Sequence, residues 1–240
     1  MLKELIDKFY LDRERSKNKD QTRFYITDAG KCPRSIFFKF KKAPKEDIDA
    51  RVLRMFDHGD YIHRLILNTL FSLGLVRSAE IGTPPQKVIS GRADAILSWE
   101  NELYVLDIKS INSFLFKNLN QPKEDNVNQL QLYLHFFGIK KGILLYVNKD
   151  TQELKEFIVI YDRQRSENLL KELDLLKDKI DKNIIPKRLS DFPSDKECQF
   201  CQFKEICKQA LASEMPWKEF KRKLESQQSF LLYGRIAEET

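Results

Sequence analysis

The chain contains four cysteines, and three of them lie close together in its C-terminal part. Cys198, Cys201 and Cys207 form a C-x2-C-x5-C pattern, whereas Cys32 stands alone far upstream. Three thiolates at this spacing can face one point, and the fourth can reach that point from another part of the fold. Four sulfur donors suit a zinc ion or an iron–sulfur cluster. The spacing by itself favours zinc and leaves the cluster open.

A second group of residues could hold a harder metal ion. Asp107 and Lys109 end the apolar segment 103–110, and their spacing of two points both to the same face of a strand. Asp94 ends the sequence Gly-Arg-Ala-Asp of the preceding strand and can lie beside them across a hairpin. Two carboxylates beside a lysine suit Mg²⁺ or Mn²⁺, which can polarise a phosphate and activate a water molecule. The alternative interpretation is a surface ion pair at a strand end.

Two helical patterns with a spacing of four flank these strands. Gly59 and His63 share one helical face, where the glycine admits a close neighbour and the imidazole is a candidate metal ligand. Gln129 and Tyr133 share a face of a later helix and can hydrogen-bond a water molecule or a phosphate oxygen. Each pattern is common by itself, and a lone histidine on an apolar helical face is usually a core residue. Asp94, Asp107 and Lys109 are typical of a metal-dependent nuclease site, and the informative property of the two helical patterns is their order around these residues along the chain.

Hydrophobic periodicity predicts the elements that position these residues. Helices are expected over 1–17, 51–73, 123–137, 163–182 and from Met215 onward. Strands are expected over 75–81, 86–98, 102–110, 142–148 and 154–161. This order predicts an α/β fold with a central mixed sheet. Three parts are expected. They are an N-terminal segment over 1–50 that contributes Cys32 to a satellite lobe, a nuclease core over 51–182, and a cysteine module with a helical tail over 183–240.

Composition limits the class of protein. A hydrophobic fraction of 42% favours a globular protein over a disordered one. No apolar run reaches the ~20 residues that span a bilayer, and the charged N-terminal segment does not look like a secretory signal. We therefore expect an intracellular protein without a membrane partner, in which cysteines favour metal over disulfides. The net charge of +6 permits DNA binding without establishing it, as does the basic run Lys39, Lys41, Lys42 and Lys45.

The order of these motifs resembles the RecB-type branch of the PD-(D/E)XK nucleases. A Cys-Pro-Arg sequence at Cys32, followed by the late C-x2-C-x5-C pattern, is similar to the members stapled by an iron–sulfur cluster, above all the CRISPR-associated Cas-four exonucleases. The resemblance covers roughly residues 25–208. It implies a restriction-endonuclease-like core with a satellite iron–sulfur lobe, and it favours a 4Fe-4S cluster over zinc. Ala93 precedes Asp94 where the strict signature has proline, a variation that is common in this branch.

The resemblance also implies a role for each residue. The metal ligands, for Mn²⁺ or Mg²⁺, would be His63, Asp94, Asp107 and the main-chain carbonyl of Ile108. The catalytic residues would be Asp94, Asp107, Lys109, Gln129 and Tyr133. The cluster ligands would be Cys32, Cys198, Cys201 and Cys207.

The resulting hypothesis is a metal-dependent DNA exonuclease that processes single-stranded ends, with 5′-to-3′ polarity implied by the resemblance. Its role would be prespacer trimming in CRISPR antiviral defence, or end resection in recombination, including that of a virus or mobile element. The CRISPR integration proteins and a second copy of the chain are candidate partners. Two alternatives come from other classes: a non-catalytic DNA-binding or inhibitor protein with the nuclease fold, and an iron–sulfur redox protein. The first is disfavoured by the intact set of Asp94, Asp107, Lys109 and His63, and the second leaves the carboxylates and Gln129 unexplained.

Overall fold

The chain divides into two compact units. The computed structural model describes residues 1–17, 20–86 and 88–226. The sheet unit comprises Met1–Gly30 and Ile48–Glu172, and the cysteine unit comprises Lys31–Asp47 and Leu173–Thr240. Within the described ranges, no helix combines the length and the apolar character that crossing a membrane requires.

The sheet unit is built on a five-stranded mixed sheet in the described part of the chain, with the order β2-β4-β5-β6-β7. The strands are β2 (Val76–Gly82), β4 (Arg92–Trp99), β5 (Glu102–Ile111), β6 (Lys141–Asn148) and β7 (Leu154–Ile160). β5 and β6 are parallel, and the other neighbouring pairs of this sheet are antiparallel. A parallel pair needs a crossover connection, which contains α5 (Glu124–Phe137). The expected α/β fold with a central mixed sheet is confirmed.

β4 and β5 form a hairpin with a two-residue turn. Glu100 and Asn101 both have positive φ angles, 50° and 62°, as type I′ turns require. The register that begins at this turn runs to the pair Ala95 and Leu106. The next residue of each strand is one of the two motif aspartates, so the turn determines which carboxylates meet.

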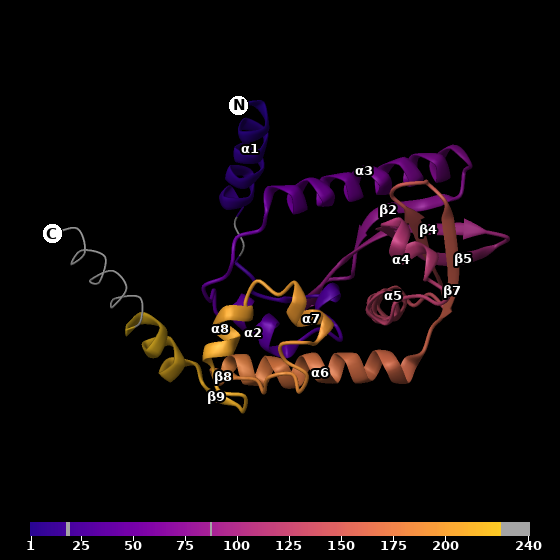
Figure 1. Cartoon of the computed structure of the whole chain (residues 1–240). Helices are drawn as coiled ribbons and strands as arrows, with labels where there is room; N and C mark the ends of the chain where they lie inside the picture. Colours follow the sequence, from indigo (N-terminus) through magenta and orange to yellow (C-terminus); the bar gives the residue numbers. More distant parts are fainter. Residues whose placement is uncertain (18–19, 87, 227–240) are drawn as a thin grey trace. The chain divides into compact units, whose positions relative to one another are not determined.

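Two helices cover opposite faces of the sheet (Figure 1). α3 (Ala50–Ser72) packs Ile62 and Leu67 against apolar residues of β4, β5 and β6. α5 packs on the other face, where its Leu130 lies over Gly142 of β6. A Cβ atom on Gly142 would lie 2.8 Å from Leu130 Cδ2, so glycine permits the close approach of α5 to the sheet.

The prediction of one strand over 86–98 was wrong, because this segment is divided at Gly91 into two strands that pair with different partners. Three short elements belong to this region: β1 (Phe24–Tyr25), the 3₁₀ helix η1 (Ile26–Asp28) and β3 (Ile89–Ser90). β3 pairs with β1 in parallel, and β4 begins only at Arg92. A Cβ atom on Gly91 would lie 2.7 Å from Ile26 Cδ1, so this tight contact depends on glycine. Lys87 lies outside the described residues.

Most other expected elements are present with small shifts of their ends. Besides α3 and α5, the observed helices include α1 (Leu2–Ser16) and α6 (Arg163–Asp181). A short helix, α4 (Ser113–Lys117), was not expected. The expected helix from Met215 begins later, with residues 217–226 helical, and the remainder of the prediction, 227–240, lies outside the described residues.

The cysteine unit gathers short elements around an aromatic core. Besides the C-terminal part of α6, they are α2 (Pro33–Phe40), β8 (Ile184–Ile185), α7 (Lys196–Gln199), α8 (Lys204–Gln209) and β9 (Met215–Pro216). Phe38 of α2 is fully buried, and its ring centroid lies 5.7 to 6.3 Å from those of Phe203, Trp217 and Phe220. The apolar run that follows Cys32 therefore forms much of the core of this unit.

Gly142→Ala should lower the free energy of unfolding by about 1–3 kcal/mol, because the added methyl group overpacks the contact between β6 and Leu130. Urea denaturation measures the change. Gly82→Ala is the matched control, since its Cβ atom would have its nearest neighbour at 4.0 Å. Equal stability of the two variants would contradict the close approach of α5.

Candidate active site and cysteine pocket

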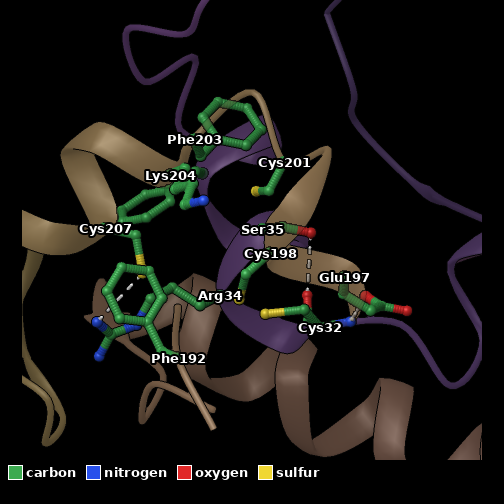
Figure 2. Close-up of a pocket in the computed structure, with 11 residues that line it drawn as sticks. Cys32, Arg34, Ser35, Phe192, Glu197, Cys198, Cys201, Phe203, Lys204 and Cys207 are labelled. Atoms are coloured by element: carbon green, nitrogen blue, oxygen red, sulfur yellow. Dashed lines mark hydrogen bonds between the residues drawn. The ribbon is translucent and has the colours of Figure 1, made fainter. Parts of the chain in front are cut away.

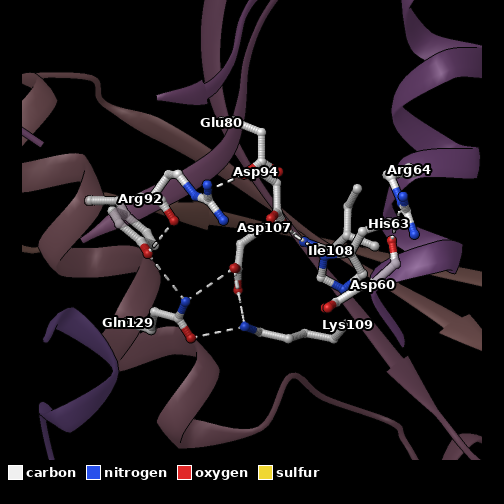
Figure 3. Close-up of polar contacts among 11 residues, drawn as sticks. Asp60, His63, Arg64, Glu80, Arg92, Asp94, Asp107, Ile108, Lys109 and Gln129 are labelled. Carbon is white, nitrogen blue, oxygen red and sulfur yellow. Dashed lines mark hydrogen bonds and ion pairs between the residues drawn. The ribbon is translucent and has the colours of Figure 1, made fainter. Parts of the chain in front are cut away.

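The backbone pairing of β4 and β5 ends beyond Ala95 and Leu106. In its place, the Asp94 carboxylate accepts a hydrogen bond from the backbone N–H of Ile108, with 2.6 Å between Oδ2 and N. β5 stays paired with β6 along this stretch, so the backbone of Asp107 is fixed. The two aspartates therefore lie side by side where the two strands separate (Figure 3).

Asp107 is the more deeply buried of the two carboxylates, and the residue is only 3% exposed. Its Oδ1 accepts hydrogen bonds from Lys109 Nζ at 3.1 Å and from Gln129 Nε2 at 3.2 Å. Its Oδ2 lies 2.8 Å from Lys109 Nζ as an ion pair, but no donor among the described residues is aligned to hydrogen-bond it. Burial raises the pKa of Asp107 to about 6; the Lys109 charge opposes this shift and Asp94 adds to it. A further cation would stabilise the ionised pair.

α5 ties the two strands together through two side chains one turn apart. Gln129 accepts from Lys109 Nζ at 2.9 Å while it donates to Asp107, so it fixes the lysine against the carboxylate. The Tyr133 hydroxyl donates to the main-chain carbonyl of Arg92 on β4 at 2.7 Å. Burial raises the pKa of Tyr133 to about 12, so its hydroxyl stays protonated. Gln129 thus positions Lys109 beside Asp107, and Tyr133 holds the strand that carries Asp94.

His63 approaches Asp94 from α3, with 3.4 Å between Nδ1 and Oδ1. Burial opposes protonation of the imidazole, but the hydrogen bond and charge of Asp94 outweigh it and raise the pKa of His63. One turn earlier, a Cβ atom on Gly59 would lie 3.2 Å from Ser110 Oγ of β5. The spacing of four therefore puts the glycine and the histidine on the side of α3 that faces the site.

Sequence reasoning missed two residues of the site. Arg92 shares the strand face of Asp94, and its Nε pairs with Glu80 Oε2 on β2 at 2.8 Å (Figure 3). The spacing of two between Arg92 and Asp94 could have found the arginine. Glu80 has a φ angle of 50°, which no sequence pattern predicts for a glutamate.

All four cysteines line one pocket of the cysteine unit (Figure 2). They are free thiols, and they come from the residue before α2, from α7, from the turn after α7 and from α8. The backbone N–H of Cys32 donates to Glu197 Oε2 at 2.7 Å, which ties the segment around α2 to the segment around α7. The structure therefore brings the lone cysteine to the C-x2-C-x5-C pattern.

The pocket combines soft donors with an apolar lining that includes Phe38 and Phe192. Burial raises the pKa of Cys32 to about 11, and burial also raises the pKa values of Cys198 and Cys201. The donor set fits a zinc ion or an iron–sulfur cluster, because both are held by deprotonated cysteines. As placed, however, the His, Cys, Asp and Glu side chains of the described residues form no group of three or more that could hold a metal ion.

Comparison with known proteins identifies the family. Residues 34–208 match the sequence pattern of the PD-(D/E)XK nuclease superfamily. The chain belongs to this superfamily. The predicted class of enzyme, a nuclease, is thereby confirmed.

This PD-(D/E)XK nuclease is 29% identical to the CRISPR-associated exonuclease Cas4 of Saccharolobus solfataricus over 167 residues, which are 62% of the chain and 75% of that protein. Its fold is similar to that of SSO0001, with a TM-score of 0.56, 24% identity, and coverage of 86% of this chain and 96% of the other. It is also similar to LHK-Exo in complex with dAMP, with a TM-score of 0.51, 12% identity, and coverage of 66% of this chain and 88% of the other. LHK-Exo is an alkaline exonuclease from Laribacter hongkongensis. The predicted resemblance and fold class are confirmed, whereas an iron–sulfur cluster is not shown by these similarities.

The site residues fit the divalent metal ion that PD-(D/E)XK nucleases use. Asp94 and Asp107 supply the hard oxygen donors that Mg²⁺ and Mn²⁺ prefer. The buried Asp107 Oδ2 accepts no hydrogen bond from the described residues, and a cation would satisfy such an atom. His63 adds a nitrogen donor on the Asp94 side.

Tyr133→Phe should lower the free energy of unfolding by about 1 kcal/mol, because the Arg92 carbonyl loses its donor. Nuclease activity should also fall, since Gln129 loses the anchoring of its helix. Tyr161→Phe is the control: it removes a hydroxyl that lies 2.8 Å from His135 Nδ1, on the opposite side of α5. Urea denaturation and an activity assay measure both variants, and equal activities would contradict the anchoring role of Tyr133.

Proposed function

We propose that this nuclease degrades DNA from single-stranded ends in a reaction that depends on Mn²⁺ or Mg²⁺, with 5′-to-3′ polarity. The observation that carries the proposal is the convergence of Asp94, Asp107 and Lys109 at one point of the sheet. Such a set can catalyse phosphodiester hydrolysis, because it provides acidic ligands for a cation and an ammonium group for the phosphate. The names of the similar proteins, an exonuclease and an alkaline exonuclease, support action at DNA ends.

The metal ion would be held by His63, Asp94, Asp107 and the main-chain carbonyl of Ile108. The Ile108 N–H points toward Asp94, and the N–H and C=O of one strand residue point to the same strand edge, which supports the carbonyl as a ligand. When bound, the ion polarises the scissile phosphate and lowers the pKa of a coordinated water molecule.

Lys109 would stabilise the negative charge that develops on the phosphate. Its ammonium group is held by Asp107 and Gln129, so the substrate meets a cation that is already in position. Gln129 and Tyr133 contribute by orientation, because they fix the lysine and the strand that carries Asp94. A water molecule or the phosphate could accept a hydrogen bond from the remaining N–H of Lys109, because both N–H groups of Gln129 are already used by Asp107 and Tyr133.

Asp107→Asn and Lys109→Met should each reduce DNA cleavage by at least about 10²-fold while the protein remains folded, because each removes charge at the site. Cleavage of end-labelled DNA measures the effect. Lys171→Met and Asp174→Asn, on exposed positions of α6, are matched controls with expected parent-like rates.

Chelation should abolish cleavage by the parent protein, and Mn²⁺ or Mg²⁺ should restore it, whereas Ca²⁺ should not, because it is larger and more loosely coordinated. Parent-like activity of Asp107→Asn or Lys109→Met would contradict the proposed site.

Charge supports a nucleic acid substrate. The net charge is +6, and the Arg92 side chain beside the site is 69% exposed, so it can contact a phosphate. The basic run that follows Cys32 supports DNA binding less well than its sequence suggests. Its Lys41 donates to the Ile180 carbonyl at 2.8 Å and lies over the Phe37 ring, so this lysine has a role within the cysteine unit.

Linear single-stranded DNA should be degraded at least about tenfold faster than a closed single-stranded circle of the same sequence, and cleavage should weaken as salt rises because phosphate neutralisation releases counterions. Gel analysis of both substrates at two salt concentrations makes the measurement. A blunt duplex is the control for strandedness. Equal rates on circles and linear strands would contradict action at ends.

We further propose prespacer trimming in CRISPR adaptation as the biological role, because the matched relative is named a CRISPR-associated exonuclease. DNA and the integration proteins would then be its partners. End resection in recombination uses the same chemistry. CRISPR adaptation genes beside this gene would favour the first role, and recombination genes the second.

For the cysteine unit, we propose a 4Fe-4S cluster held by Cys32, Cys198, Cys201 and Cys207. These are the only cysteines of the chain, and all four line one pocket. The role would be structural, because the ligands join segments that lie far apart in the sequence. A cross-link over a loop of more than 100 residues removes unfolded-state entropy worth on the order of 5 kcal/mol.

Protein purified without oxygen should be brown and contain about four iron atoms and four sulfide ions per chain. Cys201→Ala should lose this colour and melt at a lower temperature, because the two segments lose their common anchor. Ser35→Ala, which also lines the pocket but offers no thiolate, is the control and should keep its iron. Colourless protein with one bound zinc ion would contradict the cluster, and a Cys201→Ala variant as stable as the parent would contradict the structural role.

A further inference from the structure

Arg34, the last residue of the Cys-Pro-Arg sequence, is only 1% exposed. All three nitrogen atoms of its guanidinium group donate hydrogen bonds. Nε donates to the Pro186 carbonyl at 2.8 Å, and Nη2 donates to the carbonyls of Ser213 at 3.1 Å and Ala212 at 3.4 Å. Nη1 points at Cys207 Sγ, 3.8 Å away (Figure 2).

This buried cation has no carboxylate among its hydrogen-bond partners in the described part of the chain. A buried charge is costly unless an opposite charge accompanies it, and the three carbonyls are neutral. Arg188 adds to the positive charge, since its Nη1 donates to the Cys207 carbonyl at 3.3 Å. Burial lowers the pKa of Arg34, and Cys207 acts in the opposite direction. The sulfur of Cys207 is therefore the contacted group that can supply the missing negative charge.

Ligation of a metal would create that charge, because a cysteine binds metals as the thiolate. We propose that Arg34 donates a hydrogen bond to the Cys207 thiolate in the cluster-bound protein and that this bond raises the reduction potential of the cluster. The inference rests on the proposed 4Fe-4S cluster. One-electron reduction adds one negative charge to the cluster, so a neighbouring guanidinium stabilises the reduced form more than the oxidised form. Arg34 is thus a positioning residue that also tunes the cofactor.

A purely structural role is the alternative, since Arg34 also joins three carbonyls of the C-terminal segment. Such a role would change stability without shifting the potential. The measurement is therefore a potentiometric titration, in which dithionite supplies the electron and the visible absorbance reports the state of the cluster.

In Arg34→Met, the equilibrium constant for reduction should fall about tenfold, which is 59 mV for one electron. Arg188→Met is the matched control, because Arg188 contacts the carbonyl of Cys207 rather than its sulfur. Its potential should shift by less than half as much. An iron-loaded Arg34→Met protein with the parent potential would overturn the proposal.

A second measurement decides the matter if Arg34→Met does not retain iron. The Arg188→Met variant keeps Arg34 and removes the other arginine that contacts Cys207. When this variant is labelled with ¹⁵N-arginine and reduced, pulsed electron paramagnetic resonance should show a ¹⁵N hyperfine coupling that comes from Arg34. Absence of this coupling in the iron-loaded protein would overturn the hydrogen bond. A parent protein without iron and sulfide would instead contradict the proposed cluster, so the two failures are distinguishable.

Discussion

The site depends on one unfavourable event, the burial of the Asp107 carboxylate in the interior of a paired strand. Burial alone would favour the protonated form of this group, and its pKa is raised accordingly. Lys109 and Gln129 offset part of the cost, but within the described part of the chain no hydrogen bond reaches Oδ2. A buried carboxylate oxygen without this hydrogen bond lowers the stability of the folded protein, and a bound cation would compensate for it. Stability is given up where the chemistry needs a negative charge.

The neighbouring elements can be understood as the support of that carboxylate. The hairpin turn sets the register, and Asp94 replaces the lost backbone pairing by accepting from Ile108. Gly142 lets α5 lie close enough for Gln129 to reach the site. In the cysteine unit the buried charge is positive instead of negative. Arg34 is a buried cation, and the sulfur of Cys207 beside it can become an anion. Each unit thus contains a buried charge that a metal centre would compensate.

Local patterns in the sequence predicted those parts of the site that follow from periodicity. Alternation along a strand put Asp107 and Lys109 on one face, and the helical spacing of four put Gln129 and Tyr133 on one side of α5. The fold class followed from the order of helices and strands. The chemistry of the two carboxylates indicated Mg²⁺ or Mn²⁺, whereas only the resemblance to the nuclease family favoured a 4Fe-4S cluster over zinc for the cysteines.

Features that depend on contacts between distant segments were not predictable in this way. The strand is divided at Gly91, where Ile26 from a distant part of the sequence approaches closely, and periodicity alone predicted one continuous strand. The pairing of Glu80 with Arg92 depends on an unusual backbone angle. The burial of Arg34 results from carbonyls that come from a segment far along the chain.

The most direct test of the central claim, that Asp107 is buried for a metal ion, is a Mn²⁺ titration followed by electron paramagnetic resonance. The parent protein should bind one Mn²⁺ at this site, and Asp107→Asn should weaken that binding by at least about tenfold. Glu102→Gln, which alters an exposed carboxylate of the same strand, should bind like the parent. Parent-like Mn²⁺ binding by Asp107→Asn would contradict the claim.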